Sequence, residues 1–196
     1  MIAVSIIIPS FNRNVMLQRA IRSVLIQKGV PFELIVIDDG SNDGTDRMIE
    51  DFFPQVTYAY QTRQGPAAAR NHGIERAHGE WIAFLDSDDE WLEGKLEAQL
   101  CFLNQNPRYR ICQTEEIWIR NGKRVNPMKK HKKVGGMIYE QCLPLCLISP
   151  SAVMIHRELF DEVGVFDESL PACEDYDLWM CIARKFSVGL IERCYV

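Results

Sequence analysis

The first hundred residues alternate between short apolar runs and longer stretches whose apolar positions recur at helical spacing. Residues 4–8 form a β-branched run that stops at Pro9, which predicts a buried first strand. The same pattern predicts strands at 32–37, 56–60 and 81–85, and helices at 15–27, 46–53, 66–77 and 92–105. Strands that alternate with helices indicate β-α-β units, a mainly parallel sheet and an α/β fold.

Polar residues follow three of the predicted strands, at 9–13, 38–43 and 86–89. The carboxyl ends of parallel strands share one edge of the sheet, and ligands bind in the crevice beyond that edge. We therefore expect a nucleotide-sized crevice there. Neither GxGxxG nor GxxxxGK(S/T) occurs in these segments, which disfavours the usual dinucleotide-binding turn and the P-loop.

Three carboxylates gather within four residues where the strand predicted at 81–85 ends: Asp86, Asp88 and Asp89. Two like charges about 4 Å apart repel by roughly 4 kcal/mol at an effective dielectric constant of about 20, so such a cluster requires a cation or open water. Mg²⁺ uses one or two carboxylates and takes its other ligands from water and substrate phosphates. This stretch alone leaves two interpretations open, a metal–phosphate site and a polar turn that caps the next helix.

The second half of the chain is less regular. We expect one strand or a pair at 110–120, a strand at 151–155, helices at 157–163 and 174–185, and a last strand at 188–191. Residues 120–133 carry seven Lys and Arg side chains. A solvated flexible loop is the favoured interpretation of this segment, and a lid or a docking patch for an anionic acceptor or membrane surface is the alternative. The chain ends at Val196 without a closing helix, which leaves a C-terminal truncation open.

The composition is that of an ordinary single globular domain, with 196 residues, 47% hydrophobic and 25% charged. A formal net charge of −5 argues against a general nucleic-acid binder. No apolar run reaches the roughly 18–20 residues of a membrane span, and the N-terminus lacks a secretory signal. Seven cysteines without a CxxC pair favour reduced thiols. We expect a cytoplasmic protein, with contact at the inner face of the membrane left open.

Five segments of the chain form a series: VSIIIPSFNR at 4–13, LIVIDDGSNDGT at 34–45, GPAAARNHGI at 65–74, FLDSDDEW at 84–91 and CEDYDLWMCIA at 173–183. Any one of them is a weak signal, but together and in this order they resemble the family 2 glycosyltransferases. The resemblance covers nearly the whole chain. It implies the GT-A fold, with a Rossmann-like sheet and a smaller mixed acceptor-side region. It also implies one domain with a nucleotide-sugar-binding half at 1–105 and an acceptor-binding half at 106–196.

The resemblance implies a donor site. Pro9 would line the base pocket, and Asp39 would hydrogen-bond the base, which we expect to be the uracil of a UDP-sugar. Arg70 would approach the diphosphate or hold the acidic edge. Asp86-Ser87-Asp88 matches the DxD motif of the family, so Asp88 would bind Mg²⁺ or Mn²⁺, and Asp86 would bind the ribose, or the metal through water. The alternatives are a turn-forming Asp39 and a surface Arg70.

The resemblance also assigns the general base of an inverting transfer to Asp175, with Glu174 as a supporting acceptor contact. Such a base contributes typically 10²–10⁴-fold to the rate. The alternative for acidic residues at a helix start is interaction with the helix dipole. The acceptor would be a glycan, a lipid-linked molecule or a protein. Trp91 and Trp179 lie beside the acidic segments, and we expect them in the core, with the floor of a sugar pocket as the alternative.

Two other functions compete with glycosyl transfer. A sugar-phosphate nucleotidyltransferase would need a Gly-rich, basic pyrophosphate loop after the first strand, which residues 10–13 do not supply. A binding module would hold a nucleotide-sugar or glycan without turnover, and the presence of both Asp88 and Asp175 argues against it. The donor sugar, the acceptor and the oligomeric state do not follow from the sequence.

Overall fold

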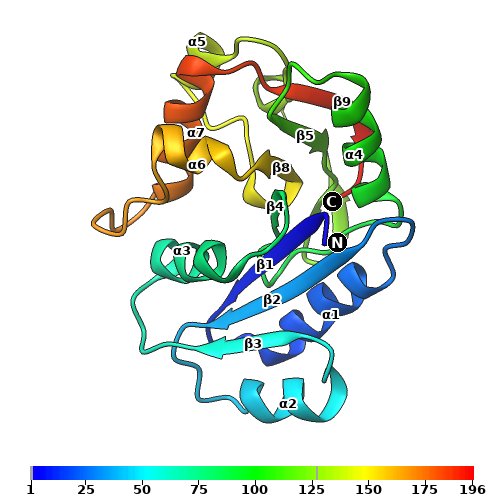
Figure 1. Ribbon diagram of the computed structural model, residues 1–196, viewed down its shortest axis with the longest axis vertical. Helices are drawn as coiled ribbons and strands as arrows, with labels where there is room; N and C mark the ends of the chain where they lie inside the picture. Colours follow the sequence, from blue (N-terminus) through cyan, green and yellow to red (C-terminus); the bar gives the residue numbers. More distant parts are fainter. Residues whose placement is uncertain (1, 127) are drawn as a thin grey trace.

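The computed structural model describes residues 2–126 and 128–196, and its centre is a seven-stranded sheet (Figure 1). The strand order is β3-β2-β1-β4-β8-β5-β9; β8 runs antiparallel to both neighbours, and the other pairs are parallel. The predicted α/β fold with a mainly parallel sheet is therefore confirmed. The strands are β1 Val4–Ser10, β2 Phe32–Asp38, β3 Thr57–Tyr60, β4 Trp81–Phe84, β5 Ile111–Glu115, β8 Val153–His156 and β9 Gly189–Cys194.

Helices cover both faces of the sheet and make three layers (Figure 1). Ile6 and Ile8 pack on the face covered by α1, α2 and α4, and Ile7 packs on the face covered by α3, α6 and α7. Burial on both faces explains the unbroken apolar runs at 6–8, 34–37 and 82–84 in the central strands. No helix of the described residues is long and apolar enough to cross a membrane. The helices are α1 Asn14–Leu25, α2 Thr45–Phe52, α3 Pro66–Arg76, α4 Lys95–Gln105, α5 Tyr139–Cys142, α6 Glu158–Val163 and α7 Glu174–Lys185.

The basic segment at 120–133 is not a plain loop, because its described residues include regular structure. Its Lys and Arg side chains are exposed as predicted, with the exception of Lys133. β6 (Trp118–Arg120) pairs antiparallel with β7 (Lys123–Val125) in a separate two-stranded sheet, and a 3₁₀ turn follows at Lys129–His131. Asn121 and Gly122 join the two strands with φ of 51° and 70°. Asn-Gly is the preferred pair for a two-residue hairpin turn of this kind, and it is the local signal that would have predicted the hairpin.

Lys133, at the end of the basic segment, is buried rather than solvated. Its Nζ lies 3.1 Å from Oε2 of Glu116, just before β6, and 3.3 Å from Oε1 of Gln113. Burial by itself would raise the pKa of Glu116, but Lys133 and the hydroxyl of Ser149 hold that pKa below its usual range. The ion pair joins the two ends of the hairpin segment.

Trp91 and Trp179 belong to the core, as expected, and the alternative of a sugar-pocket floor is excluded. They are 2% and 1% exposed. The Trp91 ring lies 4.2 Å from Nζ of Lys95, which is completely buried at the start of α4 and bonded to Oε1 of Gln99. Burial lowers the pKa of Lys95 to about 7. The helix was predicted to begin at residue 92. In the structure it begins at Lys95, whose side chain packs inward on the Trp91 ring.

Helix α3 lies so close to β1 that Gly73 has no room for a side chain. A Cβ at this position would lie 2.4 Å from Cγ2 of Ile7, which is fully buried. In an exposed helix, Gly→Ala is stabilising by about 1 kcal/mol. We expect Gly73→Ala to destabilise by roughly 1–3 kcal/mol instead, since it overpacks the core. Urea denaturation measures this loss.

Ile7→Ala removes the atoms that a Cβ on residue 73 would meet. The double variant Gly73→Ala/Ile7→Ala should therefore lose less stability than the sum of the two single variants. Simple additivity, or a stabilised Gly73→Ala variant, would show that the α3–β1 approach is not the constraint on this position.

Candidate active site

The carboxyl ends of β1, β2 and β4 meet at one edge of the sheet, as predicted. Ser10 pairs with Asp38 at the ends of β1 and β2, and the N–H of Leu85, just beyond β4, donates to the carbonyl of Ile7 (3.0 Å). A cavity of about 400 Å³ opens at this edge. Its walls include all five residues that the sequence proposed for the donor: Pro9, Asp39, Arg70, Asp86 and Asp88.

Asp39 forms one wall of the cavity and organises the loop before α3. Its Oδ1 accepts the backbone N–H of Gln64 (2.8 Å) and Nε2 of Gln61 (2.9 Å), and its Oδ2 accepts the N–H of Gly65 (2.9 Å). An ionised carboxylate offers about four acceptor positions. The protein occupies three of these, so Asp39 shapes the loop and retains acceptor capacity for one further donor.

Asp38, by contrast, is a structural residue of the turn after β2. Its Oδ1 accepts the N–H of Ser41 (2.8 Å) and its Oδ2 accepts the hydroxyl of Tyr58 (2.8 Å). Burial and this hydrogen bond raise the pKa of Tyr58. The turn needs glycine at position 40, because φ is 87° there and a Cβ would lie 3.0 Å from the backbone N of Arg63. The close approach brings Arg63 to the cavity.

The acidic turn after β4 directs its three carboxylates to three different partners. Oδ1 of Asp86 accepts a hydrogen bond from Nη2 of Arg70 (2.8 Å), while the half-exposed Asp88 forms an ion pair with Arg13 from the loop after β1. Asp89 turns inward, where its Oδ2 accepts the hydroxyl of Ser151 (2.6 Å) and burial raises its pKa to about 6. Each carboxylate has a protein partner, and these contacts relieve the repulsion inferred from the sequence.

Arg70 connects this turn to the second acidic segment. It is 5% exposed, and its Nη2 and Nη1 donate to Oδ1 of Asp86 (2.8 Å) and Oε1 of Glu174 (2.7 Å). Its Cζ lies 5.3 Å from the centre of the Phe166 ring. Burial by itself would lower the pKa of Arg70, but the two carboxylates raise it above its usual range. The surface alternative for Arg70 is wrong, because its side chain is buried and paired with a carboxylate of each acidic segment.

Glu174 and Asp175 begin α7, after Cys173 at a left-handed φ of 63°. Glu174 is 8% exposed and is held by Arg70. Burial raises the pKa of Asp175, and the nearby guanidinium of Arg70 only partly opposes this. A carboxyl group with a raised pKa is suited to accept a proton. The residues that line the cavity do not include Glu174 or Asp175, which are connected to it through Arg70. The acidic residues also lie in the first turn of the helix, where its dipole favours negative charge.

Asp86 and Asp88 are two carboxylates at this edge whose chemistry suits a divalent cation. Both line the cavity, and carboxylate oxygens are ligands that Mg²⁺ and Mn²⁺ prefer. Within residues 2–126 and 128–196, no group of three or more His, Cys, Asp or Glu side chains is arranged to hold a metal ion. A cation held by these two carboxylates would need its remaining ligands from other sources, such as phosphate oxygens and water.

Sequence reasoning named five of the residues that line the cavity and gave no binding role to the others, among them Phe11, Arg13 and Arg63. The Cζ of Arg63 lies 3.6 Å from the centre of the Phe11 ring, so an aromatic face and a cation stand together at the cavity. Phe11 and Arg13 belong to the polar segment after the first strand, which was a usable signal. Arg63 comes from the loop after β3, and no local pattern distinguishes it.

A mainly parallel sheet between helical layers, with one acidic turn after β4 and a second acidic segment at the start of α7, defines an α/β protein of the GT-A class. The family model described as Glycosyl transferase family 2 matches residues 5–164, and the chain belongs to this family. It is 37% identical over 192 residues to an uncharacterised glycosyltransferase of Rickettsia conorii, an alignment that covers 97% of this chain and 32% of that protein.

A second relative is matched over most of its length. The chain is 34% identical over 200 residues to the Escherichia coli UDP-Glc:alpha-D-GlcNAc-diphosphoundecaprenol beta-1,3-glucosyltransferase WfgD, covering 98% of this chain and 74% of WfgD. The chain thus spans most of WfgD but only about a third, 32%, of the first Rickettsia relatives.

Two solved structures share the fold. Staphylococcus aureus TarS 1–349 in complex with UDP-GlcNAc has a TM-score of 0.80 at 22% identity, over 99% of this chain and 57% of that chain. The mannosyltransferase PcManGT from Pyrobaculum calidifontis, in complex with GDP-Man and Mn²⁺, has a TM-score of 0.72 at 17% identity, over 96% and 54%. These likenesses establish the GT-A fold of the chain.

The Arg70 bridge yields a stability prediction. Arg70→Met leaves Asp86 and the buried Glu174 without their cation, and breaking a buried ion pair in this way costs about 3–5 kcal/mol. We expect a loss of that size in urea denaturation. Arg70→Met/Glu174→Leu should be more stable than Arg70→Met alone, because the second change removes the unpaired buried charge. A double variant less stable than Arg70→Met would contradict this account of the bridge.

Proposed function

We propose that this chain transfers a sugar from a nucleotide-diphosphate sugar, of the UDP class, to an acceptor hydroxyl with inversion. The observation that carries the proposal is the convergence of distant segments. The five donor-site residues line one cavity, and Arg70 links the acidic edge of that cavity to Glu174, the neighbour of Asp175. UDP-Glc in the name of WfgD and UDP-GlcNAc in the TarS complex support the choice of a UDP-sugar.

We assign the nucleotide base to the wall formed by Pro9, Phe11 and Asp39. Asp39 retains acceptor capacity after its three hydrogen bonds to the protein, which suits the N–H of a uracil ring. The diphosphate would lie toward Arg13 and Arg70, whose guanidinium groups suit phosphate oxygens. Both arginines line the same cavity as the base wall.

Asp88 and Asp86 would hold Mg²⁺ or Mn²⁺ together with the diphosphate oxygens. When bound, a divalent cation neutralises the negative charge that develops on a departing nucleoside diphosphate. The Mn²⁺ in the PcManGT complex is consistent with this choice. Asp88 is the more accessible ligand, because its side chain is 48% exposed and its protein partner Arg13 is 45% exposed.

Asp175 would serve as the general base. Its carboxylate takes the proton of the acceptor hydroxyl while the hydroxyl oxygen forms a bond to the anomeric carbon. The bond between that carbon and the diphosphate oxygen breaks, and its electron pair leaves with the nucleoside diphosphate. Attack from the face opposite the leaving group inverts the anomeric centre. Glu174, held by Arg70, would position the start of α7.

Donor binding is tested by thermal shift with UDP-, GDP- and dTDP-sugars, each with and without Mn²⁺. We expect one nucleotide class to raise the Tm in the presence of Mn²⁺, since a ligand at 100 times its Kd stabilises by about 2.7 kcal/mol. Asp88→Ala should abolish the metal-dependent part of the shift.

Glu90→Ala is the matched control for Asp88→Ala, because it removes an exposed, ion-paired carboxylate two residues further along the chain that does not line the cavity. It should retain a metal-dependent shift. If no nucleotide gives a metal-dependent shift with the unchanged chain, or if both variants lose it equally, Asp88 is not a metal ligand.

The general base is tested by release of nucleoside diphosphate from the stabilising donor, with water as the acceptor. Asp175→Asn should keep the thermal shift and lower the rate by about 10²–10⁴-fold. Because the base must be unprotonated, the rate of the unchanged chain should fall as the pH drops through the raised pKa of Asp175. Asp175→Asn should lack this acid limb.

Asp177→Asn is the matched control, since Asp177 is an exposed carboxylate in the same helical turn. It should keep the rate and its pH dependence. A full rate in Asp175→Asn, or an equal loss in both variants, would remove Asp175 from the mechanism. A chain that binds donor but releases no nucleotide would be a binding module.

A further inference from the structure

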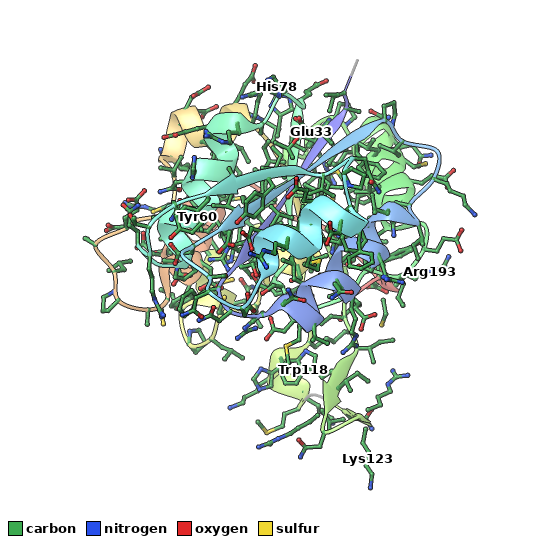
Figure 2. All side chains as sticks on the ribbon, turned by 90° about the horizontal axis from the view of Figure 1, so that it is seen from below. Glu33, Tyr60, His78, Trp118, Lys123 and Arg193 are labelled. Carbon is green, nitrogen blue, oxygen red and sulfur yellow. The ribbon has the colours of Figure 1, made fainter. Side chains whose placement is uncertain are left out.

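The hairpin β6–β7 and the 3₁₀ turn after it form a unit that stands away from the rest of the molecule. Figure 2 shows Trp118 and Lys123 on a part of the chain that projects from the body. The two strands pair only with each other among the described strands, outside the seven-stranded sheet. We call the described residues 117–126 and 128–132 the basic hairpin.

The basic hairpin concentrates positive charge on an otherwise acidic chain. No Asp or Glu occurs between residues 117 and 132, whereas the whole chain has a net charge of −5. Lys133, the seventh basic residue of the segment, is buried against Glu116 and belongs to the base of the unit. The other six basic side chains are exposed: Arg120, Lys123, Arg124, Lys129, Lys130 and Lys132.

Apolar side chains are exposed among these charges. Ile119 is 62% exposed, Met128 is 61% exposed and Trp118 is 37% exposed. A two-stranded hairpin is marginally stable by itself in water. Its exposed apolar side chains could gain free energy if a partner surface buried them. Tryptophan and aliphatic residues beside Lys and Arg are the composition of segments that lie at a membrane–water interface.

The unit has a defined orientation despite its projection. The ion pair between Lys133 and Glu116 (3.1 Å) joins its two ends, and Ser149 donates to the same carboxylate (2.7 Å). The rings of Trp118 and His131 lie 5.1 Å apart, edge to face, so the 3₁₀ turn folds back on the hairpin. Lys129 and Lys130 therefore lie on a turn that packs against the strands.

We propose that the basic hairpin docks this chain on an anionic lipid bilayer. Its lysines and arginines meet the lipid headgroups, and Ile119, Met128 and Trp118 enter the boundary between headgroups and acyl chains. A soluble polyanion would account for the charges but would leave Ile119 and Met128 exposed to water. A bilayer accounts for the basic side chains and for the exposed apolar side chains. It is therefore the partner that best matches the basic hairpin.

Docking in this way would bring the bilayer close to the active-site edge. A cavity of about 600 Å³ is lined by residues of the basic hairpin and by Asp89 and Glu116. Asp89 belongs to the acidic turn that also carries Asp86 and Asp88. The inference does not rest on the proposed transfer reaction, because membrane binding needs no nucleotide and is measured without one.

The test is flotation of the chain with vesicles of phosphatidylglycerol and phosphatidylcholine, compared with phosphatidylcholine alone. We expect binding to the anionic vesicles only, weakened by added salt. Lys123→Gln/Arg124→Gln/Lys130→Gln should weaken partitioning by roughly 100-fold. Ile119→Ser/Met128→Ser should weaken it by about tenfold or more, since two apolar side chains no longer leave water.

A control variant with the same change in net charge is Arg47→Gln/Arg76→Gln/Arg184→Gln, because all three arginines are exposed and lie outside the basic hairpin. It should bind anionic vesicles as the unchanged chain does, and an unchanged Tm in each variant checks folding. Equal loss in both triple variants would overturn the proposal. So would full vesicle binding by Ile119→Ser/Met128→Ser together with competition by long-chain polyphosphate, since that result assigns the surface to a soluble polyanion.

Discussion

Arg70 extends from α3 to two carboxylates that lie far apart in the sequence, Asp86 after β4 and Glu174 at the start of α7, at 2.8 and 2.7 Å. A buried guanidinium or carboxylate costs several kcal/mol unless it is paired and hydrogen-bonded. Each of these groups is therefore stable in its position only because the others occupy theirs. The arrangement fixes the start of α7 against the edge of the sheet, and with it the position of Asp175 relative to the cavity.

The charges around the cavity nearly cancel, which limits what can enter it. Three arginines and three carboxylates line it: Arg13, Arg63, Arg70, Asp39, Asp86 and Asp88. A diphosphate would add negative charge that Arg70, already paired with two carboxylates, cannot neutralise alone, so a divalent cation would restore the balance. The exposed Asp88–Arg13 pair contributes little to stability. Asp88 can thus exchange its partner at low cost, whereas Asp86 shares a buried network with Arg70.

Most of the sheet was predictable because β1, β2 and β4 are buried on both faces and end at polar residues. The convergence of Pro9, Asp39 and Asp86 followed from the rule for parallel strands. The ion pairs were not predictable, because they join residues that are distant in the sequence. In the sequence, a run of exposed lysines cannot be distinguished from a run in which one lysine is buried. Lys133 is such a buried lysine, paired with Glu116. The Asn-Gly turn was a local signal, and the surrounding charges obscured it.

The same uneven distribution of charge would orient the molecule at a surface. An anionic bilayer attracts the basic hairpin and repels the rest of the chain, whose acidic residues outnumber its basic ones. Turning the molecule so that another face met the bilayer would therefore be unfavourable. The basic hairpin would be the part of the chain that contacts the lipid. The Lys133–Glu116 ion pair fixes the base of the hairpin. The orientation of the hairpin on the bilayer would therefore also set the orientation of the sheet edge. The cavity between Asp89 and Trp118 would then lie beside the bilayer, where a lipid-anchored hydroxyl could reach the acidic edge.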